Sequence, residues 1–308
     1  LKSRTMHRSL AEELYEETGL DPEYVWFGTL RVALDEPFAR TLAETHSWQR
    51  EAGLSAHWLD TEEARELESG ISPEAIAALY LPEDGQVNSP RLVRALALAA
   101  IRKDVSLTEG ERVTGFLTDG ERVTGVHTAR REILAGSVVL AGGSASGMLS
   151  RSLGLRLPVH PVKGETLTVT VRSNAARANV WDNRCYLVPK RDGRVIVGAT
   201  EEPGIYDRRP SLGGVAKLSQ AAMRLLPEIS SATFAGAWGG LRPGTPDGLP
   251  FLGGVEGIEG LFLATGHYRN GVLLAPVTGE VVAALALGEP PIIDASPFSC
   301  ERSMEVTK

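Results

Sequence analysis

The 308-residue chain has few cysteines, no long apolar run and no excess of basic residues, and each absence excludes a class of protein. Two cysteines, Cys185 and Cys300, do not indicate a disulfide framework, so a reducing, cytoplasmic location is the simplest interpretation. No apolar segment reaches the roughly 18–20 residues that span a bilayer, which argues against a membrane protein. The net charge of −7, with no dominant basic patch, argues against a nucleic-acid-binding protein.

Several sequence motifs of enzymes are also missing. No Cys/His cluster has metal-ligand spacing, so we expect no metal site, and no Gly-x-Ser-x-Gly elbow is present. The small residues of Gly142–Gly147 do not match the Gly-x-Gly-x-x-Gly dinucleotide fingerprint, although they predict a strand-to-helix turn. The chain begins at Leu1, directly inside a helical pattern and without a signal peptide, so we expect it to lack an N-terminal part.

The composition that remains is that of an ordinary soluble globular protein, with 43% apolar and 23% charged residues. A length of 308 residues suits two modest domains better than one small domain. Residues 85–160 and 260–290 have the alternation of a parallel α/β domain, whereas residues 28–84 and 162–258 predict an α+β domain with antiparallel strands. We therefore predict two domains, each built from discontinuous pieces of chain.

Four segments give sharp local predictions. Val138–Ala141 is wholly apolar, which predicts a strand buried on both faces of a parallel sheet. Val105–Leu107 is predicted to form a strand. Ser89 is predicted to be a helix N-cap with Pro90 at the first helical position, and Pro276 is predicted to stand at the start of the last long helix.

The sharpest functional signal is the segment Ala264–Gly271, in which a buried strand ends at Gly266 and a loop carries His, Tyr, Arg and Asn before a helix. Glycines in such a turn allow a flat or anionic ligand to approach the backbone, and the helix N-terminus stabilises negative charge. The alternative is a tight turn with a solvated polar loop, and the spacing alone does not separate the two.

Two strand residues are further candidates. Arg242 follows Trp238 and Leu241 in a predicted strand, so its side chain can point inward. A guanidinium in a partly apolar site binds a carboxylate through two hydrogen bonds. The equal alternative is a structural arginine that pairs with a nearby acidic residue. Tyr186 offers its hydroxyl to a substrate, although strand tyrosines are more often half-buried packing residues. Cys185 has no nucleophile or metal motif and is interpreted as a core residue.

Taken together, several segments in chain order resemble the D-amino-acid oxidase superfamily of FAD-dependent oxidoreductases. The segments that carry the resemblance are Leu81–Leu92, Val138–Gly143, Pro161–Glu165, Tyr186–Pro189, Asp192–Arg194, Val197–Thr200, Gly240–Pro243, Asp247–Gly248, Gly266–Gly271 and Ala275–Pro276. Each motif alone is common, but their joint order covers nearly the whole chain. Within the superfamily, the likeness is greatest to the glycine oxidases of thiamine biosynthesis.

The resemblance implies a two-domain FAD-dependent oxidoreductase fold that combines α/β and α+β architecture. An incomplete FAD/NAD(P)-binding-like domain would comprise residues 1–27, 85–161 and 259–308, and a mixed-sheet substrate domain would comprise residues 28–84 and 162–258. Such enzymes begin with a βαβ unit that carries the dinucleotide fingerprint and an acidic residue for the ribose. We expect this N-terminal βαβ unit to be missing here.

The resemblance also implies oxidative deamination of glycine or a similar small amine or amino acid, such as sarcosine or a D-amino acid. A hydride would pass to FAD, giving an imine or 2-oxo acid, ammonia and, with molecular oxygen, hydrogen peroxide, in the service of thiamine (thiazole) biosynthesis. Assembly as a homo-oligomer is common in such a family. The sequence leaves open a D-amino-acid dehydrogenase with another electron acceptor, and a catalytically silent fragment that acts as a binding domain.

Residue roles follow from the same resemblance, with Tyr186, Arg242 and Arg269 as the implied catalytic and substrate-binding residues. Arg242 would bind the substrate carboxylate with the help of Tyr186, and Arg269 would lie near the flavin and substrate. Arg184 would be a further substrate-binding residue that influences substrate choice. The residues implied for cofactor binding are Val113, Gly142, Gly143, Arg242, Gly266, His267, Tyr268, Arg269, Asn270, Gly271, Val272 and Leu273. The protein supplies orientation and electrostatics, so no acid/base dyad is required.

Overall fold

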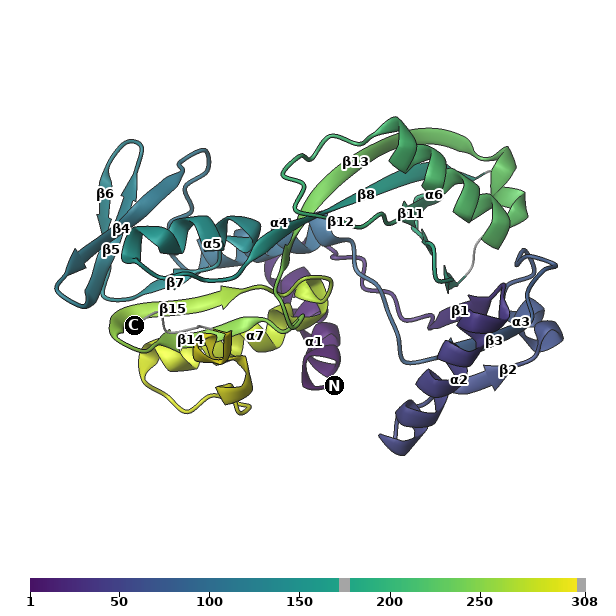
Figure 1. Ribbon diagram of the computed structural model, residues 1–308, viewed down its shortest axis with the longest axis horizontal. Helices are drawn as coiled ribbons and strands as arrows, with labels where there is room; N and C mark the ends of the chain where they lie inside the picture. The colour runs from purple at the N-terminus through teal and green to yellow at the C-terminus, as the bar shows by residue number, and fades with distance from the viewer. Residues whose placement is uncertain (172–177, 304–308) are drawn as a thin grey trace.

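The computed structural model describes residues 1–171 and 178–303. Within these residues, the strands form two sheets that lie in two lobes, with the six-stranded sheet at the left of Figure 1 and the nine-stranded sheet at the right. Three long helices lie toward the middle, namely α1 (Lys2–Thr18), α4 (Ser89–Arg102) and α7 (Gly271–Leu287). Helix α1 ends at Thr18 and is capped by Gly19, whose φ of 74° is the left-handed C-cap conformation.

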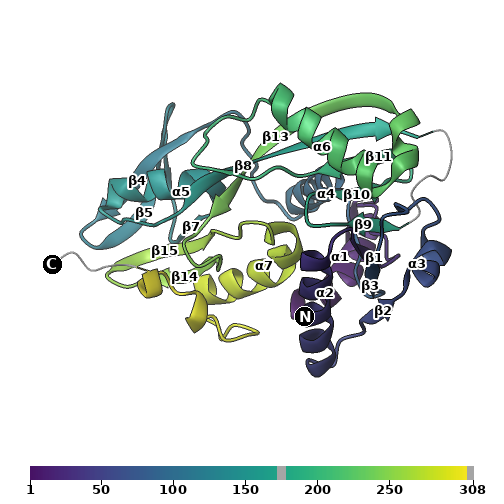
Figure 2. The same cartoon turned by 45° about the vertical axis from the view of Figure 1, so that its right-hand side comes forward.

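The nine-stranded sheet is mixed, with one parallel pair, β1 and β9, among antiparallel ones. In spatial order its path contains β12 (Glu202–Pro203), β8 (His160–Thr170), β11 (Arg194–Gly198), β10 (Tyr186–Pro189), β9 (Asn179–Trp181), β1 (Thr29–Ala33), β3 (Ala77–Leu81) and β2 (His57–Leu59), and β13 (Thr233–Gly244) pairs with β8. Its helices are α2 (Glu36–Glu51), α3 (Thr61–Leu67) and α6 (Leu212–Leu225). Figure 2 shows the long strands β8 and β13 side by side.

The six-stranded sheet combines an antiparallel meander with two parallel pairs, β7 with β15 and β5 with β15. Its path is β14 (Phe251–Val255), β15 (Ile258–Thr265), β5 (Arg122–Thr128) and β4 (Val113–Asp119), with β6 (Glu132–Leu134) beside β5 and β7 (Val138–Leu140) beside β15. The short helices are η1 (Gly143–Ala145), α5 (Ser146–Leu149), η2 (Ser150–Leu153), η3 (Pro227–Ser231), η4 (Ser296–Phe298) and η5 (Cys300–Ser303). Each sheet has its own buried apolar cluster, so the two lobes have separate cores.

The prediction that the apolar run at residues 138–141 is buried on both faces is wrong. Strand β7 does run parallel to β15, but the Val139 side chain is 43% exposed. Among the described strands β7 is hydrogen-bonded to β15 alone, so one neighbour covers only part of it. An apolar run therefore predicts the type of strand better than it predicts burial.

Two predictions around α4 are also corrected. Val105–Leu107 is not a strand, because Asp104 has a φ of 61° and the Val105 N–H bonds back to the Ala100 carbonyl, so the segment closes the end of the helix. The N-cap is Asn88 rather than Ser89, and its side chain accepts a hydrogen bond from the Arg91 N–H at 3.4 Å. Proline and serine both tolerate the first turn, so the local pattern fixed this boundary only to within one residue.

The prediction that α7 starts at Pro276 is wrong, because the helix begins at Gly271 and contains the proline. A proline inside a helix removes the hydrogen bond to the carbonyl four residues earlier, here that of Val272. His7 of α1 lies with its Nε2 3.0 Å from the Val272 carbonyl oxygen, and the Ser3 hydroxyl donates to the Leu273 carbonyl at 2.6 Å. Contacts from α1 thus satisfy the carbonyls that the proline leaves open.

Candidate active site

One face of the nine-stranded sheet carries a row of aromatic residues at its centre. Trp181 on β9 stands opposite Tyr186 on β10, which stands opposite Gly198 on β11, so strand register places them on the same face. The Trp181 and Tyr186 rings lie with centroids 4.8 Å apart. A Cβ on Gly198 would be 2.3 Å from the Tyr186 hydroxyl oxygen, so the tyrosine lies flat across the glycine. Packing on both sides fixes the direction of the hydroxyl.

Arg242 is held on the same sheet by β13. It stands opposite Val162 of β8, and its guanidinium covers Gly164, where a Cβ would be 2.0 Å from Nη1. Nη1 donates to the Thr200 carbonyl at 3.1 Å, and the Thr200 hydroxyl accepts the Glu165 N–H at 2.9 Å. Within the described residues the other Arg242 N–H groups have no acceptor, so they are free to bind a ligand.

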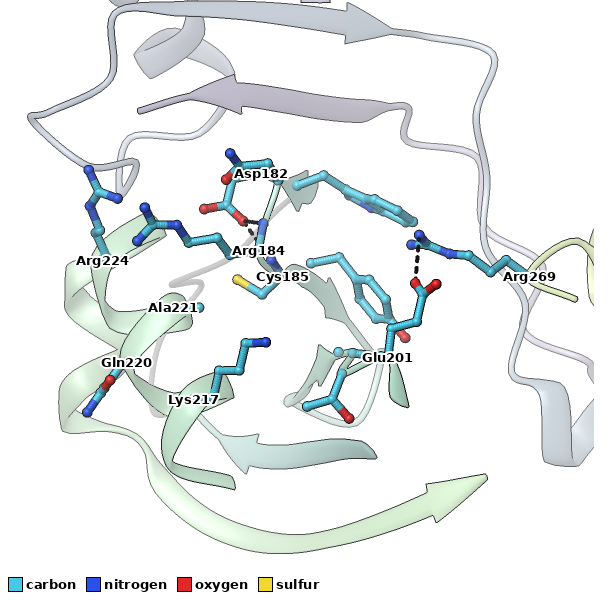
Figure 3. Close-up of a pocket in the computed structure, with 15 residues that line it drawn as sticks. Asp182, Arg184, Cys185, Glu201, Lys217, Gln220, Ala221, Arg224 and Arg269 are labelled. Carbon is cyan, nitrogen blue, oxygen red and sulfur yellow. Dashed lines mark hydrogen bonds and ion pairs between the residues drawn. The ribbon is translucent and has the colours of Figure 1, made fainter. Parts of the chain in front are cut away.

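Arg269 comes from the other lobe, in the loop between β15 and α7. The loop turns at Gly266, whose φ of 78° favours glycine, and the Tyr268 N–H donates to the Pro243 carbonyl at 3.0 Å. The Tyr268 hydroxyl donates to the Glu201 carboxylate. Arg269 Nη1 lies 3.7 Å from the other oxygen of Glu201, as the dashed line in Figure 3 shows. These contacts fasten the loop against the end of the nine-stranded sheet.

A cavity of about 750 Å³, called the central cavity here, brings together Tyr186, Arg242 and Arg269. Trp181 and Trp238 line it as well. The three residues predicted to be catalytic therefore share one space, although they come from three separate segments of the chain. The guanidinium groups of Arg242 and Arg269 and the Tyr186 phenol, in a cavity that three further arginines also line, make a site for an anion with an apolar wall, which fits an amino-acid carboxylate.

A second cavity of about 570 Å³, called the side cavity, adjoins the central one (Figure 3). The two cavities share Trp181, Tyr186 and Arg269 as lining residues. Arg184, which the sequence proposed for substrate binding, lines the side cavity and not the central one.

The residues predicted to bind a cofactor lie in two places. Gly142 and Gly143 follow β7, and the Thr265 hydroxyl at the end of β15 donates to the Gly143 carbonyl at 3.1 Å and lies 2.8 Å from the Ser146 hydroxyl. This joins them to the loop at residues 266–270. Val113 begins β4 at the far side of the six-stranded sheet and lines neither cavity.

The start of α7 has the features that a flavin ring requires. Within the described residues, the N–H groups of Gly271, Val272 and Leu273 have no acceptor, and the N-cap Asn270 makes no side-chain capping bond. The apolar side chains of Val272 and Leu273 are 43% and 45% exposed. A flat, largely apolar ring that carries negative charge at one edge would use both the free N–H groups and the exposed side chains. The residues present therefore fit FAD.

His267 in the same loop is a half-buried base, and its partial burial lowers the pKa of its imidazole. Its Nε2 lies 2.9 Å from the Thr278 hydroxyl of α7. Below about pH 6.5, the ordinary pKa of histidine, the His267 imidazole is protonated in the unfolded chain. In the folded chain it stays neutral to a lower pH. The contribution of His267 is therefore complete above about pH 6.5 and is lost as the pH falls toward the lowered pKa.

Replacing His267 with glutamine is accordingly expected to flatten the loss of stability on acidification. The measurement is the free energy of unfolding from urea titrations at about pH 7.5 and pH 5. The His57→Gln variant, which changes an exposed histidine on β2, is the matched control and should keep the wild-type slope. Identical slopes for the wild type and the His267 variant would contradict the assignment.

The structure adds site residues that the sequence interpretation missed. Trp181 and Thr200 position Tyr186 and Arg242, and Arg31 on β1 stands in register with Trp181. Burial lowers the pKa of the Arg31 guanidinium, and its Nε has no hydrogen-bond partner within the described residues. A charged residue between the apolar neighbours Leu30 and Val32 was the signal that could have identified it.

No helix within residues 1–171 or 178–303 combines the length and apolar character needed to cross a membrane. The same residues contain no group of three or more His, Cys, Asp or Glu side chains arranged to hold a metal ion.

Comparison with known proteins places these features in a family. The family model for FAD dependent oxidoreductases, DAO, matches residues 2–285. Glycine oxidase from Geobacillus kaustophilus is 41% identical over 304 residues, which cover 98% of this chain and 80% of the relative. The bifunctional protein ThiO/ThiG from Synechocystis is 34% identical over 100% of this chain and 45% of its own length. The crystal structure of the Geobacillus kaustophilus glycine oxidase superposes with a TM-score of 0.95, at 39% identity over 98% of this chain and 82% of that one. The chain therefore belongs to the DAO family of FAD-dependent oxidoreductases, and has its two-domain fold.

Proposed function

We propose that this protein oxidatively deaminates glycine or a similarly small amino acid or amine, such as sarcosine, and thereby serves thiamine (thiazole) biosynthesis. The observation that carries the proposal is that Tyr186, Arg242 and Arg269 line one cavity beside the start of α7. Its similarity to glycine oxidases and to a ThiO/ThiG protein supports the same activity and pathway. The products are an imine or 2-oxo acid, ammonia and hydrogen peroxide, with molecular oxygen as the second substrate.

Arg242 binds the substrate carboxylate in this mechanism. The Thr200 carbonyl occupies Nη1, which orients the guanidinium, and the remaining N–H groups form a fork that matches a carboxylate. Tyr186 donates its hydroxyl to the same carboxylate, and Arg269 adds a second positive charge from the opposite lobe. Holding the carboxylate at three points fixes the α-carbon and its amine for the reaction.

The cofactor would be held by Gly142, Gly143 and the segment from Gly266 to Leu273, with Val113 toward its adenine end. When bound, FAD would accept the hydride, which carries the two electrons that leave the substrate α-carbon. The chain itself supplies N–H donors at the start of α7, the neutral side chain of His267 and an apolar surface at Val272 and Leu273. These groups orient the ring and exclude water from it.

We also propose that the two lobes are the two functional domains. Residues 1–27, 85–161 and 259–308 would form the FAD-binding domain, and residues 28–84 and 162–258 the substrate domain. Strand β14 falls within the range 162–258 but pairs with β15 of the six-stranded sheet, which favours moving this strand to the FAD-binding domain. Residues 172–177 and 304–308 of these ranges lie outside the described residues. A cytoplasmic location and a homo-oligomeric state belong to the same proposal.

The test is a visible absorption spectrum of the purified protein with FAD, before and after anaerobic addition of glycine. A flavin band that glycine bleaches, followed by hydrogen peroxide on admission of air, is the expected result. Methylamine lacks the carboxylate that Arg242 holds, so at the same concentration it should leave the band unchanged. Bleaching without peroxide, but with turnover of an artificial dye, would instead indicate a dehydrogenase. A protein that binds no flavin would overturn the proposal and favour a silent binding domain.

A further inference from the structure

The side cavity is rich in basic residues for its size. It lies between the β9–β10 turn, helix α6 and the residues after β11, as Figure 3 shows. The basic residues that line it are Arg184, Lys217, Arg224 and Arg269, and the acidic ones are Asp182 and Glu201. In Figure 3 the Lys217 ammonium extends from α6 into the space between Cys185 and Glu201.

Both acids and two of the four cations in the side cavity already have partners. The Asp182 carboxylate is buried and accepts the N–H groups of Arg184 and Cys185, at 2.8 and 2.7 Å. Arg224 pairs with Glu74 at 3.0 Å. The Glu201 carboxylate accepts a hydrogen bond from the Tyr268 hydroxyl. Its other oxygen lies 3.7 Å from Arg269 Nη1.

Two cationic side chains remain, those of Arg184 and Lys217. Neither forms an ion pair or a side-chain hydrogen bond within the residues that the structure describes. Both residues are exposed, but they line the same concave surface, where the fields of two unpaired cations add. The side cavity therefore has a net capacity for one further negative group.

The place of these two cations beside the central cavity determines which part of a ligand they can bind. Tyr186 and Arg269 line both cavities, so the side cavity adjoins the space where Arg242 would hold a carboxylate. Resting on the function proposed above, we infer that Arg184 and Lys217 bind a second carboxylate of the substrate. The substrate class is then amino acids that carry a carboxylate on the amine substituent or side chain, in addition to the one at the α-carbon.

The experiment compares iminodiacetate with sarcosine, which share the glycine unit. The nitrogen carries a carboxymethyl group in iminodiacetate and a methyl group in sarcosine. The wild-type protein is expected to have the lower KM for iminodiacetate. The double variant Arg184→Gln/Lys217→Gln is expected to raise that KM about tenfold, as for loss of one charged hydrogen bond, while the KM for sarcosine changes less than about twofold. Arg40→Gln, an exposed arginine on α2 of the same lobe, removes a charge elsewhere and should change neither KM.

Two outcomes would overturn the inference. Equal rises in both KM values would mean that Arg184 and Lys217 only steer anions toward the protein, and unchanged values would mean that they do not contact the substrate. Calorimetric titration with succinate and acetate gives a second readout that does not depend on turnover. Succinate should bind about tenfold more tightly than acetate to the wild type, and the double variant should lose the difference. If succinate binds more tightly than acetate but glycine is not oxidised, only the proposed function is contradicted. If glycine is oxidised but succinate binds no more tightly than acetate, only this inference is contradicted.

Discussion

Replacing Arg242 with alanine is expected to raise the KM for glycine roughly tenfold to a hundredfold. The guanidinium donates charged hydrogen bonds to the carboxylate, and the loss of such an interaction costs about 1.5–3 kcal/mol. Because the carboxylate is bound in both the ground state and the transition state, most of the effect should appear in KM rather than in kcat. Steady-state peroxide formation over a range of glycine concentrations measures both constants.

Two variants of neighbouring glycines sharpen this test. Gly164→Ala would place a Cβ 2.0 Å from Arg242 Nη1, so it should displace the guanidinium and raise KM although Arg242 is intact. Gly240 stands opposite Gly164 in the β8–β13 pair and has open space where its Cβ would be, so Gly240→Ala is the matched control. An unchanged KM in Arg242→Ala would remove this residue from the site, and equal effects of the two glycine variants would indicate general disturbance of the sheet.

The candidate site shows which kind of information the sequence contained. The strand that carries Tyr186 and the glycine turn before Arg269 follow from local pattern, and the structure has both. The meeting of the two depends on Tyr268, whose N–H bonds to the Pro243 carbonyl across the lobes. A contact between distant segments leaves no period or spacing in the sequence, so only the resemblance brought these residues together beforehand.

The wrong local predictions have a common physical cause. Pro276 is a helix breaker by its own chemistry, yet Ser3 and His7 of α1 bond the carbonyls that it leaves open, so α7 passes through it. Val139 is apolar and was expected inside, but burial depends on how many neighbours a strand has. In both cases the decisive partner lies on another element, and local propensity is overridden by tertiary packing.

The largest stability effect is expected at a buried ion pair on β8. Lys163 Nζ lies 2.6 Å from Glu165 Oε1, and the two side chains are 6% and 1% exposed. Glu165 also accepts the Ser211 N–H at 2.8 Å at the start of α6, where a Cβ on Gly214 would be 1.4 Å from its Oε2. Burial alone would raise the pKa of Glu165, but hydrogen bonds from Lys163 and Ser211 outweigh it and lower that pKa. The pair therefore joins β8, beside Arg242, to helix α6.

The sign of the pH dependence follows from the lowered pKa of Glu165. Its contribution to stability is present above the unfolded pKa, about 4.5, and is lost as the pH falls through the lower folded value. The hydrogen bond to Glu165 raises the pKa of Lys163, so on the alkaline side the contribution of the lysine is lost only above its ordinary 10.5. Near neutral pH both groups are charged and the pair is complete.

Glu165→Leu is expected to lower the free energy of unfolding by about 3–5 kcal/mol, because it leaves the Lys163 ammonium buried without its counter-charge. The double variant Lys163→Met/Glu165→Leu should recover most of that loss, since an apolar pair of similar volume requires no desolvation of charge. Urea titration at about pH 7.5, with the slope unchanged, measures both. Glu228→Leu, at an exposed glutamate beyond the end of α6, should cost less than about 0.5 kcal/mol. A double variant no more stable than Glu165→Leu would show that the hydrogen bond to Ser211, rather than the ion pair, is what holds α6 on the sheet.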